Sequence, residues 1–391
     1  MKRRTRLLLY RAGLVALSTT LTALLLELGL RVAGYEKMGE LSGGRHRFLR
    51  TSSHPDLAYE LVPGARGRAW GFPVSINSLG FRDREVTARP RPGTHRIVVL
   101  GDSITFAEEL DVEHRFTELL QARFEAEGQP VEVLNLGVGG YDTLNEVAFF
   151  EQTGVALDPD LVVVAFCIND LGVHSTNLLM VQLLERHGAI IRRSRLAQLL
   201  AFGLDRVSLR VNFEALNRDD VFRETYASRI LPVDDDRKLR PLMRSLRRDL
   251  ESAPDRRRTE FLRWYTSAAK VGRFRYALER LRRLSREAGF RVLVTIVPYL
   301  REGEQFAAFE IVYKIVRHEA RRVGFEVLNL HQPFRSYGLF RLRPGDGGIL
   351  HPNAEGHRLM ARELFERLRT RFRDAEPEPE QDAATRAAAP R

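Results

Sequence analysis

Residues 98–110 read VVLGDSITFAEEL, an apolar run that ends in Gly101, Asp102 and Ser103. A run of Val and Leu without polar alternation is typical of a strand buried on both faces of a parallel sheet. Glycine, aspartate and serine are ordinary turn residues, but a serine in this position can also be an exposed nucleophile. A nucleophile needs a base and an oxyanion site, so the rest of the chain decides between the two interpretations.

Five short apolar runs of this kind alternate with segments of helical periodicity. The runs cover residues 96–100, 131–136, 161–166, 292–297 and 325–330. The helical segments between and after them include residues 259–288, 305–322 and 353–372. Strand and helix in alternation predict an α/β fold, a three-layer α/β/α sandwich around a central, mostly parallel five-stranded sheet. Ligands bind beyond the carboxyl ends of the strands in this architecture.

The predicted main domain spans residues 96–373. A long connection at 172–254, with helical stretches at 177–187 and 239–250, separates its third and fourth strands, and its position favours a cap over the site. Residues 37–95 are rich in Gly, Pro and Arg and predict a lead-in of short strands packed on the main domain. Residues 374–391 have the composition of a disordered tail.

The first 36 residues carry a signal for the membrane. Basic residues precede an uncharged apolar run from Ala12 to Leu26. This pattern predicts an uncleaved N-terminal transmembrane helix with a cytoplasmic N-terminus, so that everything after it lies on the extracytoplasmic side. A cleaved signal peptide is the alternative.

Composition narrows the classes of partner. The 391 residues carry 62 Lys and Arg against 51 Asp and Glu, a net charge of +11 that is spread along the chain. Because no nucleic-acid-binding module is visible, we expect no nucleic-acid partner. The single cysteine, Cys167, excludes an intrachain disulfide and a cysteine zinc site.

Polar groups follow the next two predicted strands. The second strand ends in NLGVGGYDT, residues 135–143, whose Gly137, Gly139 and Gly140 either offer backbone N–H groups to an anion or form a tight turn with positive φ. The third strand ends in FCINDL, which brings Asn169 and Asp170 to the same edge of the sheet.

A histidine follows the last strand, in GDGGILHPNAEGHRLM at residues 345–360. His351 stands just before a helix that Asn353 can cap, and Pro352 restricts its backbone. His357 lies six residues further on and is predicted to be a surface or packing residue. Four strand ends that each present a reactive or hydrogen-bonding group together predict a site.

The motifs GDSIT, NLGVGG, IND and HPN, in this order, resemble those of the SGNH, or GDSL-type, hydrolase family. The resemblance implies a flavodoxin-like sandwich and hydrolysis of esters without a metal or other cofactor. It also implies that Ser103 is the nucleophile and an oxyanion donor through its N–H, that Gly140 and Asn169 are the other oxyanion donors, and that His351 is the base.

Two positions depart from the family pattern. Cys167 stands where the family has a glycine, which narrows the space beside Asn169. The family's aspartate three residues before the histidine is Gly348 here, and the nearest aspartate is Asp346, five residues before. We expect Asp346 to reach His351 and complete a Ser-His-Asp triad; the alternative is a dyad in which a backbone carbonyl orients the imidazole.

The expected function is that of a membrane-anchored serine esterase. Its substrate would be an acylated small molecule, lipid or glycan, such as an O-acetylated envelope glycan or a lipid ester. The alternatives are an O-acyltransferase on an envelope polysaccharide and a catalytically decayed envelope binding module. Glu108, Glu109 and the connection at 172–254 are expected to shape the substrate pocket.

Overall fold

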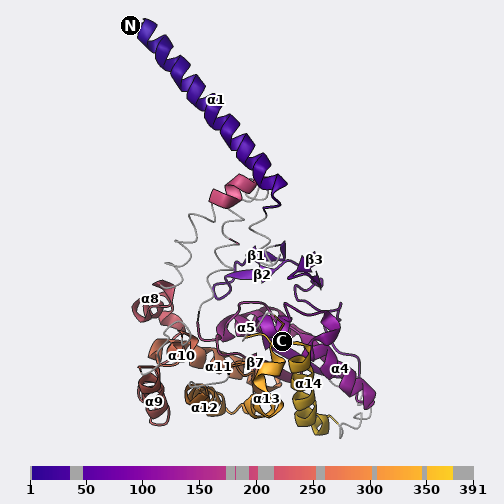
Figure 1. Ribbon diagram of the computed structural model, residues 1–391. Helices are drawn as coiled ribbons and strands as arrows, with labels where there is room; N and C mark the ends of the chain where they lie inside the picture. Colours follow the sequence, from indigo (N-terminus) through magenta and orange to yellow (C-terminus); the bar gives the residue numbers. More distant parts are fainter. Residues whose placement is uncertain are drawn as a thin grey trace, which may run out of the picture.

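A five-stranded parallel sheet forms the centre of the computed structural model (Figure 1). The structure describes residues 2–35, 47–172, 181, 193–200, 215–251, 260–301, 306–345 and 350–372. The strands are β5 (His95–Gly101), β6 (Val131–Asn135), β7 (Leu161–Phe166), β8 (Arg291–Ile296) and β9 (Glu326–Asn329). Their order is β6-β5-β7-β8-β9, and every neighbouring pair is parallel. The predicted α/β fold is confirmed, and each strand ends within one residue of its predicted bound.

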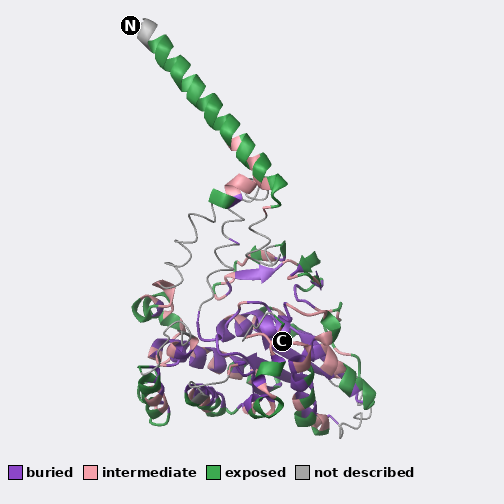
Figure 2. Ribbon diagram, viewed as in Figure 1, coloured by how far each residue is buried: buried purple, intermediate pink, exposed green. Residues whose placement is uncertain are grey.

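The position of β5 creates the place where a site can form. The chain leaves β5 for β6 on one side and then crosses to β7 on the other, so the connections diverge at the carboxyl end of β5. Residues 97–100 of β5 are fully buried, and Figure 2 shows the sheet as the buried centre of the body. A strand buried on both faces holds its end rigidly, which fixes the residues that follow it.

Helices pack in two groups around the sheet. The first consists of α4 (Phe116–Ala126) and α14 (Ala354–Leu368), which contact each other. In the second, α11 (Ala268–Ala288) contacts both α5 (Thr143–Phe149) and α12 (Phe306–Arg322). The remaining short elements of the body are α3 (Ser103–Phe106), η2 (Val112–His114), η3 (Phe150–Gly154), η4 (Val155–Leu157), α13 (His331–Tyr337), η7 (Leu339–Leu342) and η8 (Arg369–Arg371).

The prediction of a single helix at 259–288 is wrong, because the segment forms two helices, α10 (Glu260–Trp264) and α11. The Ser267 hydroxyl accepts a hydrogen bond from the Lys270 N–H and so begins a new helix. Helical periodicity on both sides of residue 267 conceals this break in the sequence.

The segment before the sheet forms two antiparallel hairpins. Strands β1 (Leu49–Thr51) and β2 (Tyr59–Leu61) make one, and β3 (Arg66–Ala69) and β4 (Phe72–Ser75) make the other. Arg82, which follows them, is buried and donates to the carbonyls of Phe106 and Ala107 at 2.8 and 2.7 Å. The lead-in thus contacts the chain directly after β5.

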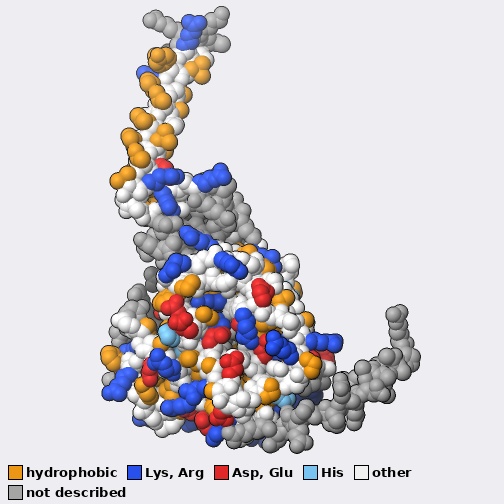
Figure 3. All heavy atoms as spheres, turned by 90° about the vertical axis from the view of Figure 1, so that its right-hand side faces the viewer, with side chains coloured by type: hydrophobic (Ala, Val, Ile, Leu, Met, Phe, Trp, Pro, Cys, Tyr) orange, Lys and Arg blue, Asp and Glu red, His pale blue; other side chains and the backbone are white. Residues whose placement is uncertain are grey.

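One apolar helix, α1 (Lys2–Val32), extends away from the body (Figure 1). Its side chains are almost all exposed, and apolar ones cover the face seen in Figure 3. The 28 residues Thr5–Val32 are long enough to cross a membrane. A helix of this kind serves either as an anchor or as a signal sequence.

Part of the connection at 172–254 packs on the second group of helices. It forms α8 (Asp219–Thr225), η5 (Ala227–Arg229) and α9 (Leu239–Glu251); α8 and η5 contact α11, and α9 contacts α12. The helix predicted at 239–250 is therefore present, whereas the one predicted at 177–187 and the tail at 374–391 lie outside the described residues, apart from residue 181. The domain boundaries and the cap stay predictions.

Candidate active site

Ser103 lies directly beyond β5, at the first residue of the one-turn helix α3. Asp102 caps this helix, since its carboxylate accepts a hydrogen bond of 2.9 Å from the Ile104 N–H. Asp102 is fully buried, and Ser103 is 7% exposed, so the nucleophile is largely enclosed by the protein. The cap and the rigid strand fix where the hydroxyl points.

His351 reaches Ser103 from the other end of the chain. Its Nε2 lies 2.8 Å from the Ser103 Oγ, although 248 residues separate them. Asn353 holds the histidine's loop: its side chain accepts from the N–H groups that begin α14 and donates to the carbonyls of Arg341 and Arg343. The predicted cap by Asn353 is thus present, and the nucleophile and the base of the prediction are in hydrogen-bonding contact.

The other nitrogen of His351 faces Glu109. The distance from His351 Nδ1 to Glu109 Oε1 is 3.6 Å. The neighbouring Glu108 accepts a hydrogen bond from the Trp70 indole at 3.2 Å, which ties the loop after Ser103 to the lead-in. Glu109 was expected only to shape the substrate pocket, and its position beside the base was not predicted. Asp346, the expected third member of the site, lies outside the described residues.

The charge around His351 favours its protonated form. Burial alone would lower the pKa of the imidazole, but the facing carboxylate of Glu109 and the charges of Glu108 and Asp102 outweigh it and raise the pKa above 6.5. A carboxylate at Nδ1 also selects the tautomer with its proton there, which leaves Nε2 free to accept a proton from Ser103.

The glycine turn after β6 packs against the nucleophile's helix. A Cβ atom on Gly137 would lie 2.5 Å from the Phe106 nitrogen, so no larger residue fits there. Gly140 has φ of 80°, as the tight-turn interpretation requires. The hydroxyl of Tyr59 in β2 donates to the Gly139 carbonyl at 2.8 Å. The lead-in therefore supports this turn, while the role of the Gly140 N–H stays a prediction.

Asn169 completes the set of strand-end groups. Its side-chain amide donates to the Asp102 carboxylate at 3.0 Å, which brings it to the same edge as the nucleophile. The adjacent Cys167, in place of the family's glycine, is buried, and its N–H donates to Asp170 at 2.9 Å. The cysteine is thus accommodated without displacing Asn169 from this edge.

A buried carboxyl group lies close enough to the site for the charge of Asp102 to act on its pKa. Glu146 in α5 is 2% exposed, and among the described residues neither of its side-chain oxygens has a hydrogen-bond partner. Burial, and then the charges of Asp102 and Asp142, raise the pKa of Glu146 well above 4.5. Arg273 pairs instead with Asp142, at 2.7 Å. Glu146 therefore keeps its proton at a pH where an ordinary glutamate is ionised.

His357 is a packing residue rather than a surface one. It is 1% exposed, and its Nδ1 accepts a hydrogen bond of 3.2 Å from the Phe116 N–H. Burial, and then the charges of His351 and Arg115, lower its pKa to about 3. His357 thus joins α14 to the start of α4 as a neutral imidazole.

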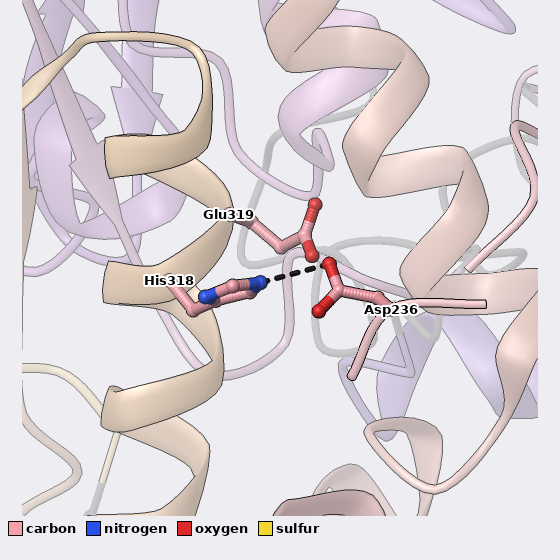
Figure 4. Close-up of side chains that lie close together, drawn as sticks. All are labelled: Asp236, His318 and Glu319. Atoms are coloured by element: carbon pink, nitrogen blue, oxygen red, sulfur yellow. Dashed lines mark hydrogen bonds and ion pairs between the residues drawn. The ribbon is translucent and has the colours of Figure 1, made fainter. Parts of the chain in front are cut away.

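A second cluster in the described part of the chain has the composition of a metal site: Asp236, His318 and Glu319 (Figure 4). His318 Nε2 lies 2.9 Å from Asp236, but the guanidinium of Arg275 also pairs with Asp236 at 2.8 Å and with Glu319 at 2.7 Å. The guanidinium supplies the positive charge that both carboxylates need, so we interpret the cluster as an ion-pair network that joins the segment before α9 to α11 and α12.

Residues 99–270 match the model of the GDSL-like Lipase/Acylhydrolase family. The matched segment contains Ser103, Gly140 and Asn169, whereas His351 lies beyond it. No curated protein matches the chain significantly.

Two solved structures are among those similar to this one. The lipase/acylhydrolase from Enterococcus faecalis is 16% identical, covers 73% of this chain and 100% of its own, and has a TM-score of 0.39. The acetylxylan esterase Axe2 from Geobacillus stearothermophilus is 14% identical, covers 74% of this chain and 99% of its own, and has a TM-score of 0.39.

Proposed function

Because the chain belongs to the GDSL-like lipase/acylhydrolase family, we propose that it hydrolyses an ester with Ser103 as nucleophile and His351 as general base. The observation that carries the proposal is the distance of 2.8 Å between Ser103 Oγ and His351 Nε2. The family match ends before His351, so this contact supports the base independently of the match.

The proposed first step is acylation of the serine. His351 Nε2 takes the proton of Ser103 as Oγ attacks the ester carbonyl, and it then gives this proton to the departing alcohol. Glu109, facing Nδ1, stabilises the imidazolium that forms between these events. Glu109 acts through the histidine and is therefore a positioning residue in this mechanism.

The negative charge that develops on the carbonyl oxygen needs donors. We propose the N–H groups of Ser103 and Gly140 and the side-chain amide of Asn169, three groups that follow three adjacent strands. One such donor contributes about 10²–10³-fold in rate. Water, activated by the same histidine, then releases the acid. These steps use only side chains, backbone and water, so we propose that they require neither a metal nor a cofactor.

We further propose that α1 stays attached and anchors the enzyme, with its body on the extracytoplasmic side. The apolar length of α1 and the basic residues before it support this arrangement.

Hydrolysis of 4-nitrophenyl acetate by the full-length protein in detergent tests the proposed activity. Ser103→Ala and His351→Ala are each expected to lower kcat/KM by at least about 10³-fold. Tyr337→Ala, at an exposed position, is the matched control for folding and should retain the activity. Equal rates in all four proteins would contradict the proposal.

A further inference from the structure

A cavity of about 300 Å³ lies next to the glycine turn of the site. Its lining includes Gly140 and Asn145 of the site region, Asp56 and Tyr59 of the lead-in, and Tyr226 of the connection at 172–254. We propose that this cavity binds the alcohol half of the ester and that this half is a neutral polyhydroxylated group such as a sugar residue. The inference rests on the proposed esterase function.

The location of the cavity connects it to the reacting carbonyl. Gly140 forms part of its wall, and the turn that contains Gly140 packs against the helix of Ser103 through Gly137. A group bound in this cavity therefore lies beside Gly140, one of the three proposed oxyanion donors. The Tyr59 hydroxyl donates a hydrogen bond to the Gly139 carbonyl and so joins the lead-in part of the lining to the same turn.

The polarity of the walls selects against an alkyl chain. Asp56, Asn145, Thr225, Arg229 and Arg273 all contribute to the lining. A lipid chain here would remove water from these groups without replacing their hydrogen bonds, which is unfavourable for each group left unsatisfied. Hydroxyl groups both donate and accept, so a sugar ring can replace that water.

The charges of the walls select against an anion. Arg229 pairs with Asp56 at 2.8 Å, and Arg273 pairs with Asp142 at 2.7 Å. Each arginine of the lining is thus neutralised by a carboxylate of the lining, and a phosphate or a carboxylate ligand would have to displace one of them. A ligand without charge can bind without breaking either of these two ion pairs.

The walls are held rigid before any ligand binds. Asp56 also pairs with Arg280 of α11 at 2.7 Å, which joins the lead-in, η5 and α11. The guanidinium of Arg273 lies 4.6 Å from the centre of the Tyr226 ring and fixes that ring at the cavity. Aromatic faces and paired polar groups, fixed in advance, reduce the entropy lost on binding.

Two acetyl esters distinguish this inference from the proposed function: a mono-O-acetylated methyl glycoside and hexyl acetate, with 4-nitrophenyl acetate as the reference. We expect the wild type to prefer the glycoside ester over hexyl acetate by at least about tenfold in kcat/KM, the equivalent of about 1.4 kcal/mol. Tyr226→Ala, and separately Thr225→Trp, which places a bulky ring at the lining, should each lower the ratio of glycoside to aryl ester activity by a similar factor.

Tyr337→Ala, outside the cavity, should leave that ratio unchanged. Hydrolysis of the aryl ester without a preference for the glycoside ester would overturn the inference alone. The inference would also fail if both cavity variants lowered the activity on the glycoside and aryl esters equally. Absence of hydrolysis of all three esters would overturn the proposed function, and the inference with it.

Discussion

His351 Nδ1 lies 3.6 Å from the carboxylate of Glu109, while the other nitrogen of the ring contacts Ser103. Nucleophile and carboxylate come from one short segment, helix α3 and the loop that follows it, six residues apart, and only the histidine comes from a distant part of the chain. Arg82 holds this loop by donating to the carbonyls of Phe106, Ala107 and Leu110. Arg82 therefore fixes the segment that carries both partners of the base, Ser103 and Glu109.

Glu109→Gln should lower kcat/KM on 4-nitrophenyl acetate by about 10²–10⁴-fold, because the imidazolium loses its carboxylate. The base must be neutral to act, so activity rises with pH through the pKa of His351. Since Glu109 raises this pKa, the variant's acidic limb should move to lower pH. The measurement is a pH profile of kcat/KM.

Glu113→Gln, at an exposed position of the same region, is the control and should leave both rate and profile unchanged. Glu109→Asp should restore part of the activity of Glu109→Gln. A large loss in Asp346→Asn together with a normal profile in Glu109→Gln would assign the orienting role to Asp346 instead.

Arg82→Met should both destabilise the protein and lower its activity. The substitution leaves buried carbonyls without their donor, at about 1–3 kcal/mol each, and frees the loop that carries Ser103 and Glu109. Thermal unfolding and esterase assays measure the two effects. Arg84→Met removes a half-exposed guanidinium two residues away and should have a much smaller effect on stability and on activity. Equal effects of the two substitutions would show that the contacts of Arg82 do not specifically hold this segment.

Glu146→Gln should stabilise the protein increasingly as the pH rises. The folded pKa of Glu146 lies above its unfolded value, so the folded state binds the extra proton and stability is lost as pH rises from about 4.5 through the folded pKa. Glutamine removes this loss. Scanning fluorimetry should give a Tm gain over wild type of about 2 °C or more at pH 8 and a smaller gain at pH 5. A gain that shrinks between pH 5 and pH 8 would contradict the assignment.

If α1 anchors the protein in the membrane, the full-length protein should stay in the membrane pellet after a carbonate wash. A form that begins at residue 37 lacks α1 and should appear in the supernatant when made in the same cells. Release of the full-length protein by carbonate would mean that α1 is cleaved or does not span the bilayer. N-terminal sequencing of the pelleted protein separates an intact anchor from a processed one.

Much of the fold could be predicted because its strands are buried on both faces and appear in the sequence as continuous runs of Val, Ile and Leu. The carboxyl ends of the parallel strands account for the nearness of Ser103, Gly140 and Asn169. They do not account for His351, because α13 and η7 separate it from the end of β9, and its pairing with Ser103 was implied by the family resemblance. The position of Glu109 was not predictable, because it depends on the turn at Ala107, whose φ of 58° is unusual for a residue with a side chain. The sequence around Ala107 contains no pattern that predicts such a turn.

The contacts by which the lead-in supports the site could not be predicted from the sequence either. Arg82 and Tyr59 reach the site through single side-chain contacts with carbonyl groups, and any arginine or tyrosine in a segment rich in turns has the same appearance in the sequence. The burial of His357 was left open for a related reason: its partner is a backbone N–H at the start of another helix. Such contacts depend on the three-dimensional packing of distant segments.

Covalent labelling by a fluorophosphonate tests the central claim, that His351 activates Ser103, most directly. Intact-mass analysis and peptide mapping of the full-length protein should find one adduct, on Ser103. Ser103→Ala should give none, and His351→Ala should be labelled at least about 10²-fold more slowly because the base is missing. Labelling of another residue, or equal labelling rates in wild type and His351→Ala, would contradict the account.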